Sequence, residues 1–190
     1  MLINSEIKMM SNNKNFQSMK LSNEISNFKL IPNIIKIIGE LNNKLNFENN
    51  EDIIISIKYG KRIVINCTNS NFKKMNANDF IEIVDYNPIK KMLLILGQNQ
   101  PDFNMTLHWI IQNARRDENV LIQLISNSLV SKLNKNNKKQ IENNSIEISK
   151  DILIKFRNSN IAINKKHGIF IIANNLNEIN SIINKLLEEK

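Results

Sequence analysis

Few side chains in this chain can do acid–base, nucleophilic or metal chemistry, because its 190 residues include two histidines and one cysteine. His167 precedes Gly168 between two short apolar runs. His108 lies beside Trp109 in a largely apolar segment, and Cys67 lies in a polar loop without a base adjacent in sequence. A catalytic zinc ion needs about three protein ligands, and structural zinc cages use several cysteines or histidines. The sequence therefore contains too few histidines and cysteines for a conventional zinc site.

Each of these residues also has a structural explanation. His167 and Gly168 can form a turn between strands, in which Gly168 supplies an unusual backbone angle or close packing. His108 can be a buried, hydrogen-bonded side chain on its helix. Cys67 can be an unreactive thiol, and Asp79 can cap a local turn.

Hydrophobic periodicity predicts alternating helices and strands around these residues. Apolar residues recur at three- and four-residue spacing behind Pro32, and Tyr59-Gly60-Lys61 separates two β-branched runs as in a hairpin. We expect a turn at 85–88, a short helix within 72–80 and an exposed loop at 134–144. The predicted helices cover 34–45, 103–115, 127–133, 146–156 and 176–187, and the predicted strands cover 53–58, 62–66, 81–84, 92–96, 120–125, 161–163 and 169–173.

This order of elements predicts an α/β fold with three layers, α/β/α. Tight turns between several neighbouring strands favour a central mixed, mainly antiparallel sheet over a strictly parallel one. Residues 1–22 are polar and without periodicity, so we expect a mobile N-terminal tail followed by one domain at 23–190.

The charge of +8 raises the question of nucleic acid. The lysines are scattered, accompany an excess of Asn and Ile with AT-rich codons, and are not interleaved with aromatic residues. We therefore do not expect a nucleic-acid partner, although a polyanion-binding surface stays open as an alternative with steep salt dependence. The N-terminus lacks the apolar block of a secretory signal, and no apolar run is long enough to span a membrane, so we expect a cytoplasmic protein.

Several short segments, in order, resemble the class II aldolase/adducin family. Ser56-Ile57-Lys58 is similar to the end of its Gly-Asn-hydrophobic-Ser segment, and Asn76 to Phe80 to its Thr-x-x-Asp-hydrophobic segment. Pro101 to His108 resembles its Pro-Ser-x-Glu-x-x-x-His segment. Arg115 to Val120 resembles its Arg-Pro-Asp-Val segment, and His167-Gly168 matches its late His-Gly.

The resemblance implies a zinc-dependent enzyme, and the departures from it remove the zinc chemistry. The family's catalytic Glu is replaced by Asn104, which does not exchange a proton near neutral pH. The family's His-x-His ligands are replaced by Gln123 and Ile125, so His167 is the one retained ligand position. We therefore expect no cofactor, where the family has zinc.

By resemblance, this is a degenerate member acting as a non-catalytic assembly or ligand-binding module, and a homo-oligomer, with the tetramer as the family's usual form. The alternative is a divergent aldolase or epimerase that acts at the same cleft with altered or absent metal. Candidate residues for a ligand cleft are Ser56, Lys58, Thr68, His108 and His167. The sequence does not identify a substrate or partner.

Overall fold

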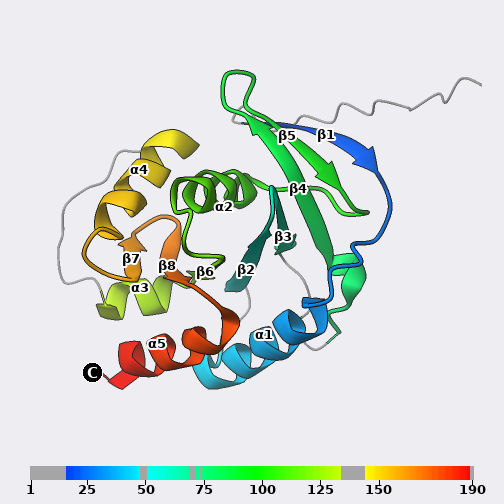
Figure 1. The fold of residues 1–190 in the computed structure, drawn as a ribbon. Coiled ribbons are helices and arrows are strands. Elements are labelled where there is room, and N and C mark those ends of the chain that lie inside the picture. Colours follow the sequence, from blue (N-terminus) through cyan, green and yellow to red (C-terminus); the bar gives the residue numbers. More distant parts are fainter. Residues whose placement is uncertain (1–15, 48–50, 69–71, 73, 134–143, 189–190) are drawn as a thin grey trace, which may run out of the picture.

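The computed structural model describes residues 16–188 except for 48–50, 69–71, 73 and 134–143. One eight-stranded sheet forms the centre of the fold (Figure 1), in the order β1-β5-β4-β3-β2-β6-β8-β7. The strands are β1 Gln17–Ser22, β2 Asp52–Tyr59, β3 Arg62–Asn66, β4 Phe80–Asn87, β5 Met92–Leu96, β6 Val120–Ile125, β7 Ile161–Asn164 and β8 Gly168–Ala173. Strand β1 runs parallel to β5, and the other neighbouring pairs are antiparallel. The predicted mixed, mainly antiparallel sheet is confirmed.

Helices cover both faces of this sheet. They are α1 Ile31–Leu45, α2 Phe103–Ala114, α3 Asn127–Leu133, α4 Ser145–Lys155 and α5 Leu176–Glu188, with a short 3₁₀ helix, η1, at Ala77–Asp79. Buried side chains of α1, α3 and α5 pack against β2, β6 and β8 on one face. Buried side chains of α2 and α4 pack against β6 and β8 on the other. The three-layer α/β/α architecture is therefore confirmed.

Strand alternation decides which side chains face α2. Successive residues of a strand point to opposite faces, so Val120, Ile122 and Leu124 of β6 join the α1 and α5 core. Leu121 joins the α2 and α4 core. Gln123 lies on that same face, buried beneath α2 although it is polar.

Two sequence expectations are corrected by the sheet. Residues 17–22, expected in the mobile tail, form β1, whose Met19 pairs with Leu94 of β5. Backbone pairing along an edge needs little apolar burial, and this explains why a polar segment with weak alternation forms a strand. Residues 85–87, expected in a turn, continue β4 past an irregularity in its pairing with β5. The rest of the predicted tail, 1–15, lies outside the described residues.

The other local expectations have mixed outcomes. Asp79 accepts from the backbone N–H of Asn76 at 2.8 Å within a capping box, as predicted for a local cap. The short helix expected within 72–80 is a single 3₁₀ turn. Most of the loop expected at 134–144 lies outside the described residues, and Asn144 caps α4 instead.

Gly168 meets both conditions expected of it. Its φ is +93°, and a Cβ atom built on it would lie 2.1 Å from the carbonyl oxygen of Leu124. No side chain can be accommodated that close to the neighbouring strand, so Gly168 allows β8 to pair tightly with β6.

Gly168→Ala should lower the free energy of unfolding by about 3 kcal/mol or more, because it combines backbone strain with a clash against backbone. Urea denaturation of both proteins measures the loss. Gly60→Ala is the matched control: φ there is +58° with open space around the position. That variant should lose about 1 kcal/mol. Equal losses would contradict the steric explanation.

Candidate functional site

A chain of hydrogen bonds lies under α2 and joins two strands and a turn to it. The Ser56 hydroxyl of β2 lies 2.6 Å from Nδ1 of His108 on α2. Nε2 of His108 lies 3.2 Å from the side-chain oxygen of Gln123. Ser56, His108 and Gln123 are fully buried. The chain therefore lies in the interior of the fold.

The direction of each hydrogen bond follows from donor chemistry. The Gln123 side-chain oxygen can only accept, so Nε2 of His108 carries a proton and donates it. Nδ1 of the neutral ring is then an acceptor, and the Ser56 hydroxyl donates to it. Burial lowers the pKa of His108 to about 3, and the bond to Gln123 opposes this shift. The neutral imidazole is the form that the surroundings favour.

The Gln123 amide extends this chain to two further residues. Its Nε2 donates to Oδ1 of Asn104 at 3.0 Å and to the carbonyl oxygen of His167 at 2.7 Å. Both amide hydrogens and the oxygen of Gln123 are therefore engaged. Asn104, Gln123 and His167 come from a helix, a strand and a turn, and the structure brings all three together.

The turn that contains His167 is held by hydrogen bonds from its backbone N–H groups to the side chain of Asn164. Oδ1 of Asn164 accepts from the N–H groups of Lys166 at 3.0 Å and His167 at 3.1 Å. The partly buried His167 ring lies 5.7 Å from that of Phe103, centroid to centroid. Burial, followed by the Lys166 charge, lowers the pKa of His167.

Thr68 lies at the start of α2, next to this group of residues. Its hydroxyl donates to Asp102 at 2.5 Å, and Asp102 caps α2 by accepting from the backbone N–H of Asn104 at 2.7 Å. Burial raises the pKa of Asp102, and its hydrogen bonds oppose that rise. Sequence reasoning missed Asp102, although an Asp directly before an apolar helix is a typical N-cap.

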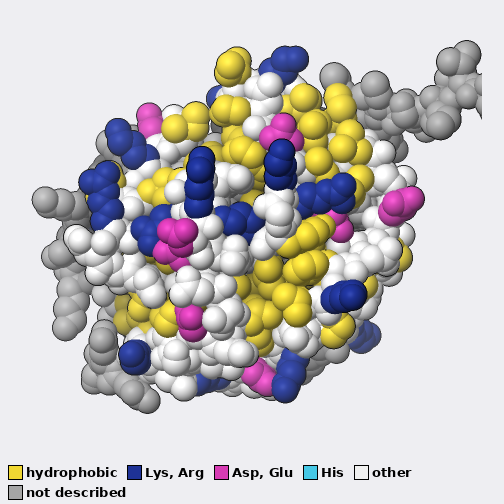
Figure 2. All heavy atoms as spheres, viewed as in Figure 1, with side chains coloured by type: hydrophobic (Ala, Val, Ile, Leu, Met, Phe, Trp, Pro, Cys, Tyr) yellow, Lys and Arg dark blue, Asp and Glu magenta, His cyan; other side chains and the backbone are white. Residues whose placement is uncertain are grey.

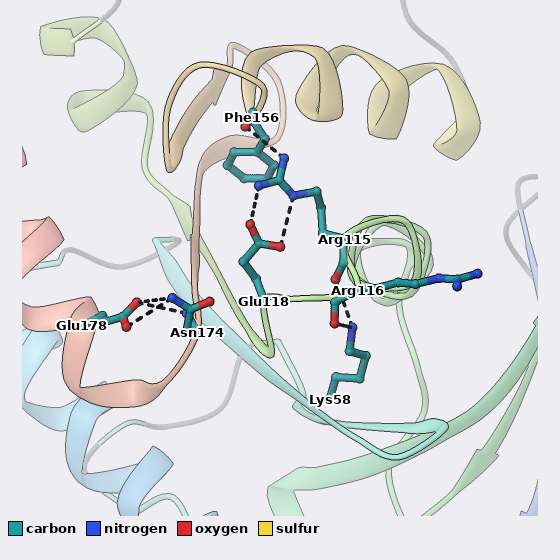
Figure 3. Close-up of polar contacts among 7 residues, drawn as sticks. All are labelled: Lys58, Arg115, Arg116, Glu118, Phe156, Asn174 and Glu178. Atoms are coloured by element: carbon teal, nitrogen blue, oxygen red, sulfur yellow. Dashed lines mark hydrogen bonds and ion pairs between the residues drawn. The ribbon is translucent and has the colours of Figure 1, made fainter.

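Lys58 lies away from the other candidate cleft residues, at the C-terminal end of α2. Its ammonium group donates to the backbone oxygens of Gln112, Arg115 and Arg116 at 3.0, 3.0 and 3.1 Å. Figure 3 shows this contact beside the ion pair of Arg115 with Glu118. Burial lowers the pKa of Lys58. All three ammonium hydrogens are used in closing a helix end, which is a favourable place for a cation.

The candidate cleft is therefore not one continuous site. Ser56 and His108 are buried within the fold, Thr68 contacts the α2 cap, and Lys58 lies at the far end of that helix. Ile125 is partly buried against the apolar cluster on the α2 side of β2, β3 and β4. Cys67 is buried too, and burial raises its pKa to about 12, which keeps it a thiol.

Sequence reasoning also missed Gln112. Its amide nitrogen donates to the backbone oxygens of Ser56 and Asn119, both at 3.1 Å, and it is fully buried on α2. Its position in the 3.6-residue repeat of α2, one turn after His108, was the available signal.

The chain matches known proteins in its structure and not in its sequence. No family model and no curated protein matches the sequence. An L-fuculose 1-phosphate aldolase superimposes with a TM-score of 0.63 at 14% identity, over 87% of this chain and 84% of that one. This chain has the class II aldolase fold.

Further structures of the class II aldolase fold agree. YgbL from Klebsiella pneumoniae gives a TM-score of 0.66 at 10% identity, over 87% of this chain and 88% of its own. A sugar-phosphate aldolase from Thermotoga maritima gives 0.57 at 12% identity, over 81% and 88%. At these identities the likeness establishes the fold and leaves the chemistry to the residues present.

His108 should make stability depend on pH. Its pKa is about 3 in the folded chain against 6.5 for a solvent-exposed histidine, so below pH 6.5 the unfolded chain binds the additional proton. Stability is then complete above pH 6.5 and falls with pH, by up to about 1.4 kcal/mol per unit. Urea denaturation between about pH 7 and 5 should show this dependence, and His108→Gln should reduce it.

The matched control is His167→Gln, because His167 is the other histidine of the chain. That variant should keep the larger part of the pH dependence, since His167 is only partly buried. If His108→Gln leaves the pH dependence of wild type unchanged, the buried neutral ring is contradicted.

Proposed function

We propose that this chain uses the class II aldolase fold as a binding or assembly module, with an active site that no longer supports zinc-dependent carbon–carbon cleavage. The observation that carries the proposal is that the oxygen and both N–H groups of the Gln123 amide are engaged in hydrogen bonds within the protein. Its oxygen accepts from His108, and its nitrogen donates to Asn104 and to the backbone of His167. These bonds fix the position of the amide, so a metal at its oxygen would compete with the N–H that His108 donates to the same atom.

The donor set does not fit zinc in other respects. Zinc sites use thiolate, imidazole or carboxylate ligands, and a catalytic site has about three of them. The positions assigned by resemblance hold Gln123, Ile125 and His167, of which only His167 is an ordinary zinc ligand. Among the described residues, no group of three or more His, Cys, Asp or Glu could hold a metal ion.

The acid–base position supports the same proposal. Asn104 occupies the place of the family's catalytic Glu by resemblance, and a carboxamide does not exchange protons near neutral pH. Its side-chain oxygen accepts from Gln123. Asn104 therefore serves the hydrogen-bonded chain under α2 in place of a proton-transfer role.

A metal-free enzyme at the same place is less well supported. Ser56 and His108 form a close pair, yet both are fully buried, so a substrate does not reach them in this fold. The amine of Lys58 is engaged by three backbone oxygens and is poorly placed to attack a carbonyl group. The residues named for divergent chemistry are thus used in holding the fold together.

Zinc content tests the proposal. Untagged protein, incubated with zinc and freed of excess, should retain far less than one ion per chain by elemental analysis. The variant Gln123→His with Ile125→His restores the family's ligand types beside His167 and should retain about one. Adding His167→Asn to it should abolish retention. Stoichiometric zinc in the wild type would overturn the proposal.

Cleavage assays test the chemistry separately. Wild-type protein with L-fuculose 1-phosphate and added zinc should release no aldehyde above the background of the protein-free mixture. Zinc-dependent release that disappears in His167→Asn would establish a working active site and contradict the proposal.

Assembly into a homo-oligomer is part of the same proposal. Ile89 at the tip of the β4–β5 hairpin is 92% exposed, and Ile146 and Ile154 of α4 are about half exposed. Apolar side chains at the surface favour contacts with other chains. Light scattering after size-exclusion chromatography should give a molar mass that is a multiple of the chain mass. If the β4–β5 hairpin is part of the contact between chains, Ile89→Asp should lower this molar mass. A monomer at micromolar concentration would contradict assembly.

No helix among the described residues has the length and apolar character needed to cross a membrane.

A further inference from the structure

A groove runs between α1 and α5, on the face of the sheet opposite α2. Its wider part is a cavity of about 430 Å³ where both helices begin. A second cavity, of about 260 Å³, continues along the two helices. Both are lined by Asn33 of α1 and by Leu176 and Asn177 of α5, so they form one elongated depression.

The two helices run alongside each other in the same direction (Figure 1). Asn33 and Asn177, near their starts, line the same cavities, and Lys44 bonds to Asn184 near their ends. This contact lies beyond the residues that line the narrower cavity, and the wide end lies beside β2 and β6.

The wide end is an apolar pocket. Ile57 of β2, Val120 of β6 and Leu176 line it, together with Phe28 and Tyr59, whose rings stack at 4.6 Å between centroids. Figure 2 shows hydrophobic side chains at the surface between the start of α1 and the start of α5. A pocket of this size and lining suits an apolar side chain.

Carboxamides surround the groove. Asn33, Asn119, Asn177 and Asn180 line it, and within the described part of the chain these side chains have no hydrogen-bond partner. A carboxamide has the same donor and acceptor as a peptide unit, so it can pair with a backbone amide on both sides. Asn180 lines only the narrower cavity, so a small molecule in the apolar pocket would make no contact with its carboxamide.

Spacing along α5 agrees with an extended backbone. Asn177 and Asn180 lie on one face of the helix, since they are three residues apart. Asn184 continues that face beyond the narrower cavity. From Asn177 to Asn184 the helix rises about 10 Å, close to three residues of extended chain at about 3.3 Å each.

The charges beside the groove favour an acidic occupant. Lys29 lies between the pocket residues Phe28 and Leu30, and it is exposed. Lys58 lines the wide pocket. Lys36 and Glu40 both line the narrower cavity, and they pair at 3.8 Å, so their charges balance there. The whole chain carries +8. Acidic residues flanking the occupant would gain from this surplus.

We infer that the groove between α1 and α5 binds an extended peptide segment of a partner protein, with an apolar anchor residue in the pocket and acidic residues beside it. The inference rests on the proposed binding role and supplies its partner class. Carboxamides of α1, of α5 and of Asn119 directly before β6 pair with the peptide backbone, and the pocket selects the anchor.

A phage-displayed library of random 12-residue linear peptides, selected on the immobilised full chain, tests the inference. Enriched peptides should combine Leu, Ile, Phe or Met with neighbouring Asp or Glu. A fluorescein-labelled peptide made from the enriched pattern then gives Kd by fluorescence anisotropy. Failure to enrich any pattern, or enrichment of basic peptides, would overturn the inference.

Variants place the binding in the groove. Asn33→Ala with Asn177→Ala should weaken Kd about tenfold, because two backbone-pairing amides are lost. Lys29→Glu with Lys36→Glu should weaken it as well, and Asn43→Ala should leave it unchanged. Asn43 is an exposed carboxamide of α1 that does not line either cavity. Unfolding midpoints confirm that each variant is folded.

Equal Kd values for the groove variants and Asn43→Ala would overturn the inference. So would displacement of the peptide by metabolites of low molecular mass that bind with the same dependence on Asn33 and Asn177. Zinc content, measured on the same preparation, decides the proposed loss of zinc chemistry independently, because Gln123 and His167 lie away from the groove, on the α2 side of the sheet.

Discussion

The structure depends on a buried hydrogen-bonded chain that has a single direction. Ser56 donates to His108, His108 donates to Gln123, and Gln123 donates to Asn104 and to the backbone of His167. These bonds connect β2, α2, β6 and the β7–β8 turn across the α2 face of the sheet. Buried polar groups are costly unless each is satisfied, so removing one member exposes the others to that cost. The hydrogen-bonded chain thus holds together the region between α2 and the sheet.

A metal bound through the Gln123 side chain would compete with this hydrogen-bonded chain for one oxygen. Zinc at the Gln123 oxygen would weaken the bond that this oxygen accepts from His108, in a fully buried place. The apolar cores on both faces of the sheet are built from other residues. This separation of fold from site explains how a chain at 10–14% identity to its structural neighbours keeps their architecture.

Periodicity predicted most elements of the fold, since the apolar residues of α1 and the alternation of β2 and β6 are set by burial. It was wrong at β1, an edge strand whose side chains carry little signal. It was also wrong at residues 85–87, which continue β4 by backbone pairing with β5 although turn-forming residue types occur there. For the site, the types of Asn104, Gln123 and Ile125 predict an absence of zinc chemistry, and this stays a prediction. Sequence could not predict that Asn104, Gln123 and His167 bond to one another, or that Lys58 closes a helix end, because such contacts join elements far apart along the chain. Asp102 and Gln112 were missed because an N-cap and a buried amide resemble ordinary polar residues in a linear pattern.

The most direct test is the protonation state of His108, read from ¹⁵N chemical shifts of the imidazoles between about pH 8 and 5. The chain has two histidines, so the spectrum holds two sets of ring signals, and a His167→Gln sample assigns them. The hydrogen-bonded chain predicts that His108 is a neutral ring with its proton on Nε2, without titration over that range and without change on adding zinc. A ring that titrates near pH 6.5, or shifts of metal coordination when zinc is added, would contradict the hydrogen-bonded chain and the function proposed from it.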